Sequence, residues 1–247
     1  MSSGESDPGQ VSRVFDRTRW SVVAGAAAGK HESLLDLCQQ YWYPAYAYVR
    51  RCGHDAAESN AIVRAFLGLL VAERLEGVDA RSCGRFREYL RGELSRYLAR
   101  GRHRGGESDG GIGLTAPVAA EVMEDRYLGE ATENDTPESA FERAFAHDVI
   151  GRAFERLAGE ARQAGRMDMY QALEPYLAAE PPPGEYERMA TLLGTRPLAL
   201  VIALKRMRQR FRELVNHELA ETVSSEEDLA AERQTLSMVL GSEGKHR

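Results

Sequence analysis

The sequence predicts an all-α protein built from two helical domains. Apolar residues recur at helical spacing through most of the 247 residues, and the alternation typical of strands is essentially absent. Five glycines between 105 and 113 precede an acidic stretch with little periodicity, as expected of a linker. We therefore expect a disordered lead-in at 1–17, a first helical domain at 18–104, a flexible acidic linker at 105–137, a second helical domain at 138–219, and a C-terminal helix and tail at 220–247.

The first domain should begin with two helices. Thr18 can cap a short helix over 19–28. A longer helix is expected over 31–51, where Pro44 should kink or restart it because proline lacks a backbone N–H. The aromatic residues of this helix could stack on nucleic-acid bases or form core, and their helical spacing favours core. They are Tyr41, Trp42, Tyr43, Tyr46 and Tyr48.

A third helix should follow Gly53. Asp55 and Glu58 have the spacing of a capping box, in which carboxylates satisfy free backbone N–H groups. The segment from 61 to 75 is apolar over most of its circumference. That pattern indicates a buried central helix or one whose outer face meets a partner.

An arginine-rich helix is expected over 84–104. Eight arginines and no lysine lie between 81 and 104, against Glu88 and Glu93. Arginine suits bidentate phosphate contacts and stacking on bases, and interleaved aromatics suit unwound DNA. The alternative is a solvated amphipathic helix. The candidate DNA contacts here are Arg85, Arg87, Tyr89, Arg91, Arg96, Tyr97 and Arg100.

The second domain should begin with a helix opened by Thr136, Pro137 and Glu138, and should end in a helix-turn-helix over 185–214. Gly194 suits a left-handed cap, and Pro197 suits the first turn of a new helix. Ser225 can cap a last helix, whose role the sequence leaves open: folding over the DNA-binding face, capping the second domain, or recruiting a partner.

The second helix of this motif carries six basic residues and no acid between Arg196 and Arg212. A helix-turn-helix places such a helix in the major groove while flanking cations hold phosphates. The alternative is an ordinary helical hairpin with a solvated basic face. The candidate DNA contacts are Arg196, Lys205, Arg206, Arg208 and Arg210. Few side chains there can read bases, because the helix begins with Leu198, Leu200, Val201 and Ile202.

Composition excludes several other classes of protein. The net charge of −6 divides unevenly: +4 over 1–104, −8 over 105–144 and −2 over 145–247. No apolar run is long enough for a transmembrane helix, and the N-terminus lacks a secretory signal. Three cysteines without CxxC spacing fit a reducing cytoplasm. No phosphate-binding loop, metal-ligand pattern or catalytic constellation occurs, so we expect no enzyme activity, cofactor or metal.

An ordered set of short motifs resembles one protein family. The motifs are Thr18-Arg-Trp-Ser21, Tyr41-Trp-Tyr-Pro44 with Tyr46 to Arg51 after it, Gly53-His54, Gly84-Arg-Phe-Arg87, Thr136-Pro-Glu138 and the terminal helix-turn-helix. Together they resemble an extracytoplasmic-function-like RNA polymerase sigma factor of the kind found in planctomycete-type bacteria. The resemblance spans residues 18–240, nearly the whole chain.

The resemblance implies a cytoplasmic protein that binds core RNA polymerase and directs it to promoters. The first domain would be sigma region two, which contacts the unwound −10 element through the arginine-rich helix. The second would be region four, which contacts the −35 element through the helix-turn-helix. The partners implied are core polymerase and promoter DNA, with no membrane, and an anti-sigma protein or a Ser/Thr kinase stays open. The implied polymerase contacts are Glu58, Ser59, Asn60, Ile62 and Arg64.

The chain departs from the family where polymerase would bind. Family members carry several carboxylates early in the helix after Gly-His, and here only Glu58 remains among residues 57–61. Arg64 would place a positive charge against a positive polymerase surface. Two alternatives to a standard sigma factor therefore stay open. One is a factor that needs activation, for example by phosphorylation of Ser59. The other is a degenerate module that binds DNA or a regulatory protein without initiating transcription.

Overall fold

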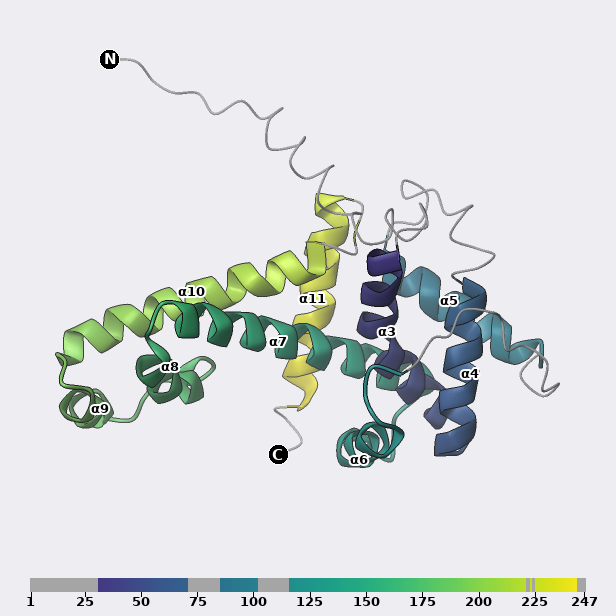
Figure 1. Cartoon of the computed structure of the whole chain (residues 1–247), viewed down its shortest axis with the longest axis horizontal. Helices are drawn as coiled ribbons and strands as arrows, with labels where there is room; N and C mark the ends of the chain where they lie inside the picture. The colour runs from purple at the N-terminus through teal and green to yellow at the C-terminus, as the bar shows by residue number, and fades with distance from the viewer. Residues whose placement is uncertain (1–30, 71–84, 102–115, 221–222, 224, 244–247) are drawn as a thin grey trace, which may run out of the picture. The chain divides into compact units, whose positions relative to one another are not determined.

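The computed structural model describes residues 31–70, 85–101, 116–220, 223 and 225–243, and these are almost entirely helical (Figure 1). Within these ranges no β-strand forms, although an antiparallel bridge joins Arg85 and Val223. The all-α prediction is therefore confirmed for this part of the chain. No helix in the described ranges is sufficiently long and apolar to cross a membrane. The expected lead-in at 1–17 and the helix at 19–28 lie outside the described residues.

The chain divides into two compact units, which are residues 1–148 with 219–247 (unit 1) and residues 149–218 (unit 2). Unit 1 contains α3 (His31–Arg51), α4 (Ala56–Leu69), α5 (Phe86–Ala99), α6 (Ala120–Glu130), the start of α7 (Pro137–Gln163) and α11 (Glu226–Glu243). Unit 2 contains the rest of α7, α8 (Met167–Leu173), the short 3₁₀ helix η4 (Glu174–Tyr176), α9 (Glu185–Leu193) and nearly all of α10 (Pro197–Ala220). The division differs from the expected domain limits, because unit 2 begins inside α7 and the C-terminal helix belongs to unit 1.

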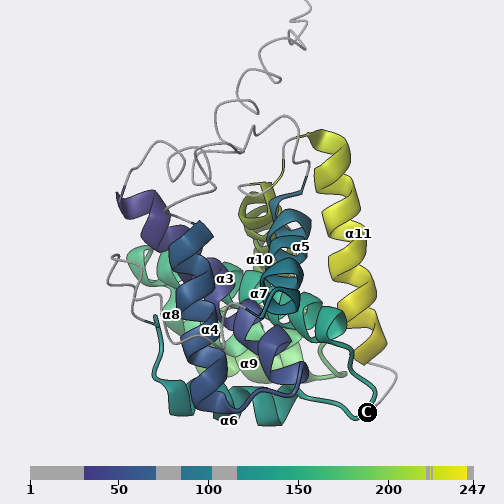
Figure 2. The same ribbon diagram turned by 90° about the vertical axis from the view of Figure 1, so that its right-hand side faces the viewer.

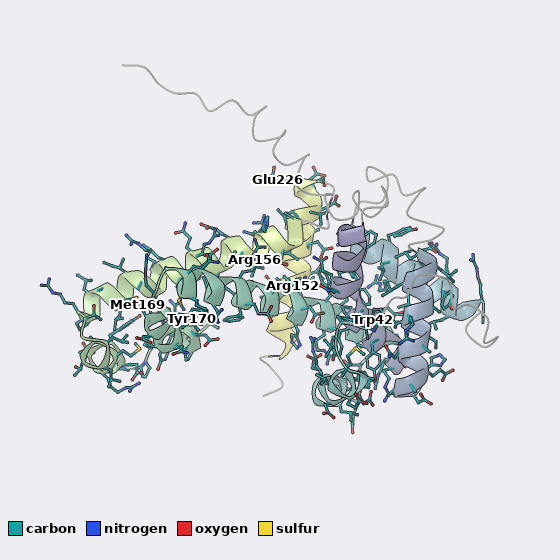
Figure 3. The ribbon with its side chains drawn as sticks, in the orientation of Figure 1. Trp42, Arg152, Arg156, Met169, Tyr170 and Glu226 are labelled. Carbon is teal, nitrogen blue, oxygen red and sulfur yellow. The ribbon has the colours of Figure 1, made fainter. Side chains whose placement is uncertain are left out.

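Aromatic residues of α3 form the core of unit 1. Tyr41, Trp42 and Tyr46 are fully buried, and Trp42 lies among the helices of this unit (Figure 3). The Tyr41 ring meets Phe86 edge to face at 5.4 Å and stacks on Phe145 at 5.7 Å. These rings are core, and they offer no stacking surface to a base. α3 also runs through Pro44 without restarting.

Local capping signals at three helix starts are confirmed, although Glu58 contacts His54 and does not complete the expected capping box. The Asp55 carboxylate accepts a hydrogen bond from the Glu58 N–H at 2.8 Å. The Thr136 hydroxyl accepts from the Ser139 N–H at 3.1 Å, and Ser225 accepts from the Asp228 N–H at 3.0 Å. Each bond satisfies one of the N–H groups that a helix leaves free at its first turn. Neighbouring residues thereby fix where three helices begin, at Ala56, Pro137 and Glu226.

The second half of the expected linker forms a helix instead. In α6, Met123 and Tyr127 are buried one turn apart, and this two-residue stripe is too short for a periodicity argument to detect. The acids of α6 bind polar groups of α3: Glu124 accepts from Tyr46 at 2.6 Å and Glu130 accepts from Tyr43 at 2.9 Å. The acidic composition that suggested a tether is therefore used to attach α6 to the aromatic helix.

The C-terminal helix α11, yellow in Figure 2, belongs to unit 1. Leu229 and Leu236, two turns apart on α11, are buried. Glu232, midway between them, is 2% exposed and forms an ion pair with Arg87 of α5. The sequence leaves the role of this helix open. The structure shows that it contacts the arginine-rich helix α5.

Unit 2 is built around the second half of α7 and α10. Phe154 and Phe211 meet with ring centroids 4.5 Å apart. Arg152 and Arg156, one turn apart on α7 (Figure 3), both bind the buried Glu218 carboxylate, at 2.8 and 2.7 Å. A second apolar cluster joins α8, α9 and α10 through Leu173, Met189, Ala190, Leu200 and Leu204.

Candidate nucleic-acid interface

The helix-turn-helix forms as predicted. α9 ends at Leu193, Gly194 takes a left-handed conformation with φ of 61°, and α10 begins at Pro197. A side chain at Gly194 would be strained at that φ, so glycine is what permits the sharp turn. The Thr195 N–H donates to the Ala190 carbonyl at 2.9 Å, which closes the turn. Two helices joined by three residues thus present the start of α10 at the surface.

Three of the five cations assigned to this motif stay available. Arg196, Lys205 and Arg206 are exposed, and no carboxylate partner is found for them in the described part of the chain. Arg196 immediately precedes the first turn of α10, whose free N–H groups attract anions. These three side chains can therefore meet phosphate without first losing a partner.

The other two cations are already engaged. The Arg208 guanidinium donates to the carbonyls of Tyr176 and Ala179, and to the Glu180 carboxylate. It thereby satisfies backbone groups left free after η4. Arg210 binds Glu160 at 2.6 Å and Glu213 at 3.1 Å, and the hydrogen bond that it donates to Glu160 is the main cause that raises the pKa of Arg210. Neither residue offers the free charge that the sequence suggested.

The apolar start of α10 divides into two faces. Leu200 is fully buried against α8 and α9, so it belongs to the core and cannot reach a base. Leu198 is 68% exposed, and Val201 and Ile202 are exposed by 42% and 45%. Leu192 of α9 adds a further exposed side chain. An exposed apolar stripe therefore lies on the same helix as Lys205 and Arg206.

The arginine-rich helix α5 differs, because carboxylates meet most of its cations. Arg87 is only 2% exposed and contacts the Glu142 and Glu232 carboxylates, with its Nε 3.1 Å from Glu232 Oε2. Arg91 also binds Glu142, at 2.6 Å. Arg85 and Arg96 bind acids of α5 itself, Glu88 and Glu93. Arg100 is exposed and is the α5 candidate for which the described residues supply no carboxylate.

Burial also removes part of the aromatic surface expected on α5. Tyr97 is 8% exposed and packs against Phe66 of α4, with ring centroids 5.7 Å apart. Tyr89 is partly exposed and lies 6.0 Å from the Phe86 ring. Two of the predicted DNA contacts, Arg87 and Tyr97, are therefore buried in unit 1, which corrects that part of the prediction.

The stretch assigned to polymerase binding is also divided between surface and core. Glu58 and Arg64 are exposed, and Glu58 lies 3.0 Å from His54. Asn60 is partly buried and accepts a hydrogen bond from Trp42 at 3.1 Å. Ser59 and Ile62 are buried, at 0% and 3% exposure. A kinase cannot reach the Ser59 hydroxyl in this conformation, so activation by phosphorylation at that residue is not supported.

The residues that sequence reasoning missed are the acids that neutralise these cations. Glu142 and Glu232 lie 51 and 145 residues from the arginines they bind. Glu160 lies 50 residues from Arg210. No spacing rule links residues so far apart, so no local signal could have found them. In the described ranges no group of three or more His, Cys, Asp or Glu could hold a metal ion.

No protein-family model, curated protein or solved structure matches the chain. A functional assignment therefore rests on the residues of the chain itself.

Proposed function

We propose that the chain is a sigma-factor-like transcription protein that binds duplex promoter DNA through α9 and α10. The observation that carries the proposal is a helix-turn-helix whose second helix has no acid between Arg196 and Arg212. Among the described residues, no carboxylate meets the exposed Arg196, Lys205 or Arg206. The family resemblance of the ordered motifs supports the same reading. No enzyme activity is part of the proposal.

In this proposal the start of α10 enters the major groove. Arg196, Lys205 and Arg206 hold phosphates and fix the helix on the duplex. The exposed Leu198, Val201 and Ile202 contact base edges, where an apolar side chain favours the C5-methyl group of thymine. We therefore expect a preference for thymine-containing sites, with the affinity coming mainly from phosphate contacts.

Unit 1 would bind core polymerase through the exposed surface that includes Glu58 and Arg64. In a sigma factor it would also hold the unwound −10 strand, through the exposed Arg96 and Arg100 of α5. The second candidate is a sigma-like module that binds duplex DNA without opening promoters. The neutralised arginines of α5 and the single acid among residues 57–61 favour that candidate.

A salt titration tests the DNA-binding proposal. The full chain is titrated onto a 30-bp mixed-sequence duplex at several salt concentrations, beside a variant carrying Arg196→Gln, Lys205→Gln and Arg206→Gln. Each lost phosphate contact should reduce the slope of log affinity against log salt by roughly 0.9, so the variant's slope should be shallower by about 2–3. Arg162→Gln removes an exposed arginine of α7 and serves as the control, with an unchanged slope expected. Equal slopes for all three proteins would refute the proposal.

A transcription assay separates the two candidates. Purified bacterial core polymerase is mixed with the chain on the DNA that lies upstream of its own gene. A sigma factor should bind core polymerase and support promoter opening and repeated transcription. Duplex binding without core binding supports the module that does not initiate.

A further inference from the structure

A solvent-open cavity of about 650 Å³ lies within unit 2, between α7, α8 and α10. Alanines line it from two sides: Ala161 on α7 and Ala164 just after that helix, and Ala199 and Ala203 on α10. Met169 and Tyr170, labelled on α8 in Figure 3, contribute the third side. The small side chains leave space that larger ones would fill. The volume lies within the range of about 300–1,000 Å³ that ligand sites usually have.

The lining is suited to an apolar chain. Apart from Tyr170, Glu160 and three arginines, every residue that lines the cavity is apolar. The Tyr170 hydroxyl already donates to Glu174 at 3.3 Å. Few groups remain to read a sugar or a base by hydrogen bonding, so a nucleotide would lose its bonds to water without replacement. An alkyl chain has no such bonds to lose and gains from leaving water.

The charged groups of the cavity favour an anion at one end of that chain. Arg166, Arg206 and Arg210 line the cavity together with one acid, Glu160. Both Glu160 oxygens accept hydrogen bonds from Arg210, and these bonds are the main cause that lowers the pKa of Glu160. Arg166 and Arg206 are exposed and have no carboxylate partner in the described part of the chain. Two guanidinium groups are thus left for a ligand.

We infer that this cavity binds a single-chain anionic amphiphile of the fatty-carboxylate class. The alkyl chain lies between the alanines of α7 and α10 and the Met169 side chain, and the carboxylate is held by Arg206 and Arg166 at the edge. A planar guanidinium matches a carboxylate with two parallel hydrogen bonds. The inference does not depend on whether unit 2 binds DNA.

Isothermal titration of the full chain with dodecanoate, decanoate and octanoate, each below its critical micelle concentration, tests the inference. Each methylene group removed from water should tighten binding about fourfold, so dodecanoate should bind roughly fifteenfold more tightly than decanoate. Dodecanol has the same chain without the charge and should bind at least about tenfold more weakly than dodecanoate. Affinity that does not change with chain length, or the absence of binding, overturns the inference.

Variants then locate the site. Arg206→Gln should weaken dodecanoate binding about tenfold. Ala199→Phe places a large ring at an exposed position of the cavity wall and should abolish binding without disturbing the core. Arg212→Gln, an exposed arginine of the same helix outside the cavity, is the control and should bind as the parent does. Circular dichroism checks that each variant is folded. Full binding by both cavity variants overturns the assigned site.

Discussion

Two helices of this protein, α5 with its flanking Arg85 and Arg100 and α10 with the preceding Arg196, are rich in arginine and lysine, yet their cations are used in different ways. On α5 the arginines at 85, 87, 91 and 96 each contact a carboxylate. On α10 and the turn before it, Arg196, Lys205 and Arg206 meet no carboxylate in the described ranges. The comparison teaches that a count of arginines measures total charge, whereas nucleic-acid binding requires charge that the fold leaves unpaired.

The difference arises from where the acids lie in the sequence. α5 carries Glu88 and Glu93 within itself, and it packs against helices that supply Glu142 and Glu232. α10 has no acid before Glu213, and within the described ranges carboxylates reach Arg208 and Arg210 of this helix. Arg196, Lys205 and Arg206 therefore keep their positive charge at the surface.

The largest expected effect separates a structural arginine from an exposed one. Arg87→Met would leave the buried Glu232 carboxylate without its cation and Glu142 with Arg91 alone, which should cost about 3–5 kcal/mol of the free energy of unfolding. Arg100→Met, at the exposed end of the same helix, should change it by less than about 0.5 kcal/mol. Urea denaturation followed by circular dichroism measures both.

A second substitution tests whether the unpaired carboxylate causes the loss of stability in Arg87→Met. Adding Glu232→Gln to Arg87→Met removes the unpaired charge of Glu232 and should restore part of the loss. If Arg87→Met is as stable as the parent, the assignment of Arg87 to the core of unit 1 is wrong.

A second comparison concerns two leucines of α10. Leu200 is fully buried, so Leu200→Ala should lower the free energy of unfolding by about 2–5 kcal/mol. Leu198 is 68% exposed, and Leu198→Ala should change stability by less than about 0.5 kcal/mol. Thermal unfolding compares the pair. Equal losses for both would mean that the two faces of α10 are assigned incorrectly, and with them the surface proposed to face DNA.

The smallest expected effect is a loss of stability at acidic pH. Burial acts to raise the pKa of Glu130, but hydrogen bonds from His147, Arg126 and Tyr43 outweigh it and lower the pKa to about 2. A carboxylate whose pKa is lowered in the folded state stabilises the fold at any pH above its pKa in the unfolded chain, near 4.5. This stabilisation is lost as the pH falls toward 2. Unit 1 should therefore lose about 2 kcal/mol from this group between pH 6 and pH 3.

Glu130→Gln tests that origin, because glutamine fills the same space and does not titrate in this range. The variant should be less stable than the parent at pH 6, and the difference should shrink by pH 3 when both are followed by urea denaturation. A difference that stays constant with pH would show that the ionised carboxylate of Glu130 does not contribute as described.

Features decided by neighbouring residues could be predicted from the sequence. The caps at Asp55, Thr136 and Ser225 follow from side chains within one turn of the N–H groups they satisfy. The turn at Gly194 and Pro197 follows from backbone preferences of those two residues. The helical class and the helix-turn-helix therefore needed no knowledge of the distant parts of the chain.

Features decided by distant residues could not be predicted. α6 is held by tyrosines some 80 residues earlier, and its own buried stripe consists of Met123 and Tyr127. Arg87 and Arg96 look alike in sequence, yet one is buried between two other helices and the other is exposed. Only the packing of whole helices distinguishes them, and that packing is also what hides the Ser59 hydroxyl.

The ion pair between Arg87 and Glu232 joins residues 145 positions apart, and this has a consequence during synthesis. At about 5–20 residues per second, the ribosome adds Glu232 on the order of ten seconds after Arg87. Until then the nascent α5 lacks the carboxylate that α11 brings, and Glu142 is the one of its two acidic partners that Arg87 can meet. The emerging chain thus carries one more uncompensated positive charge on α5 than the folded protein does.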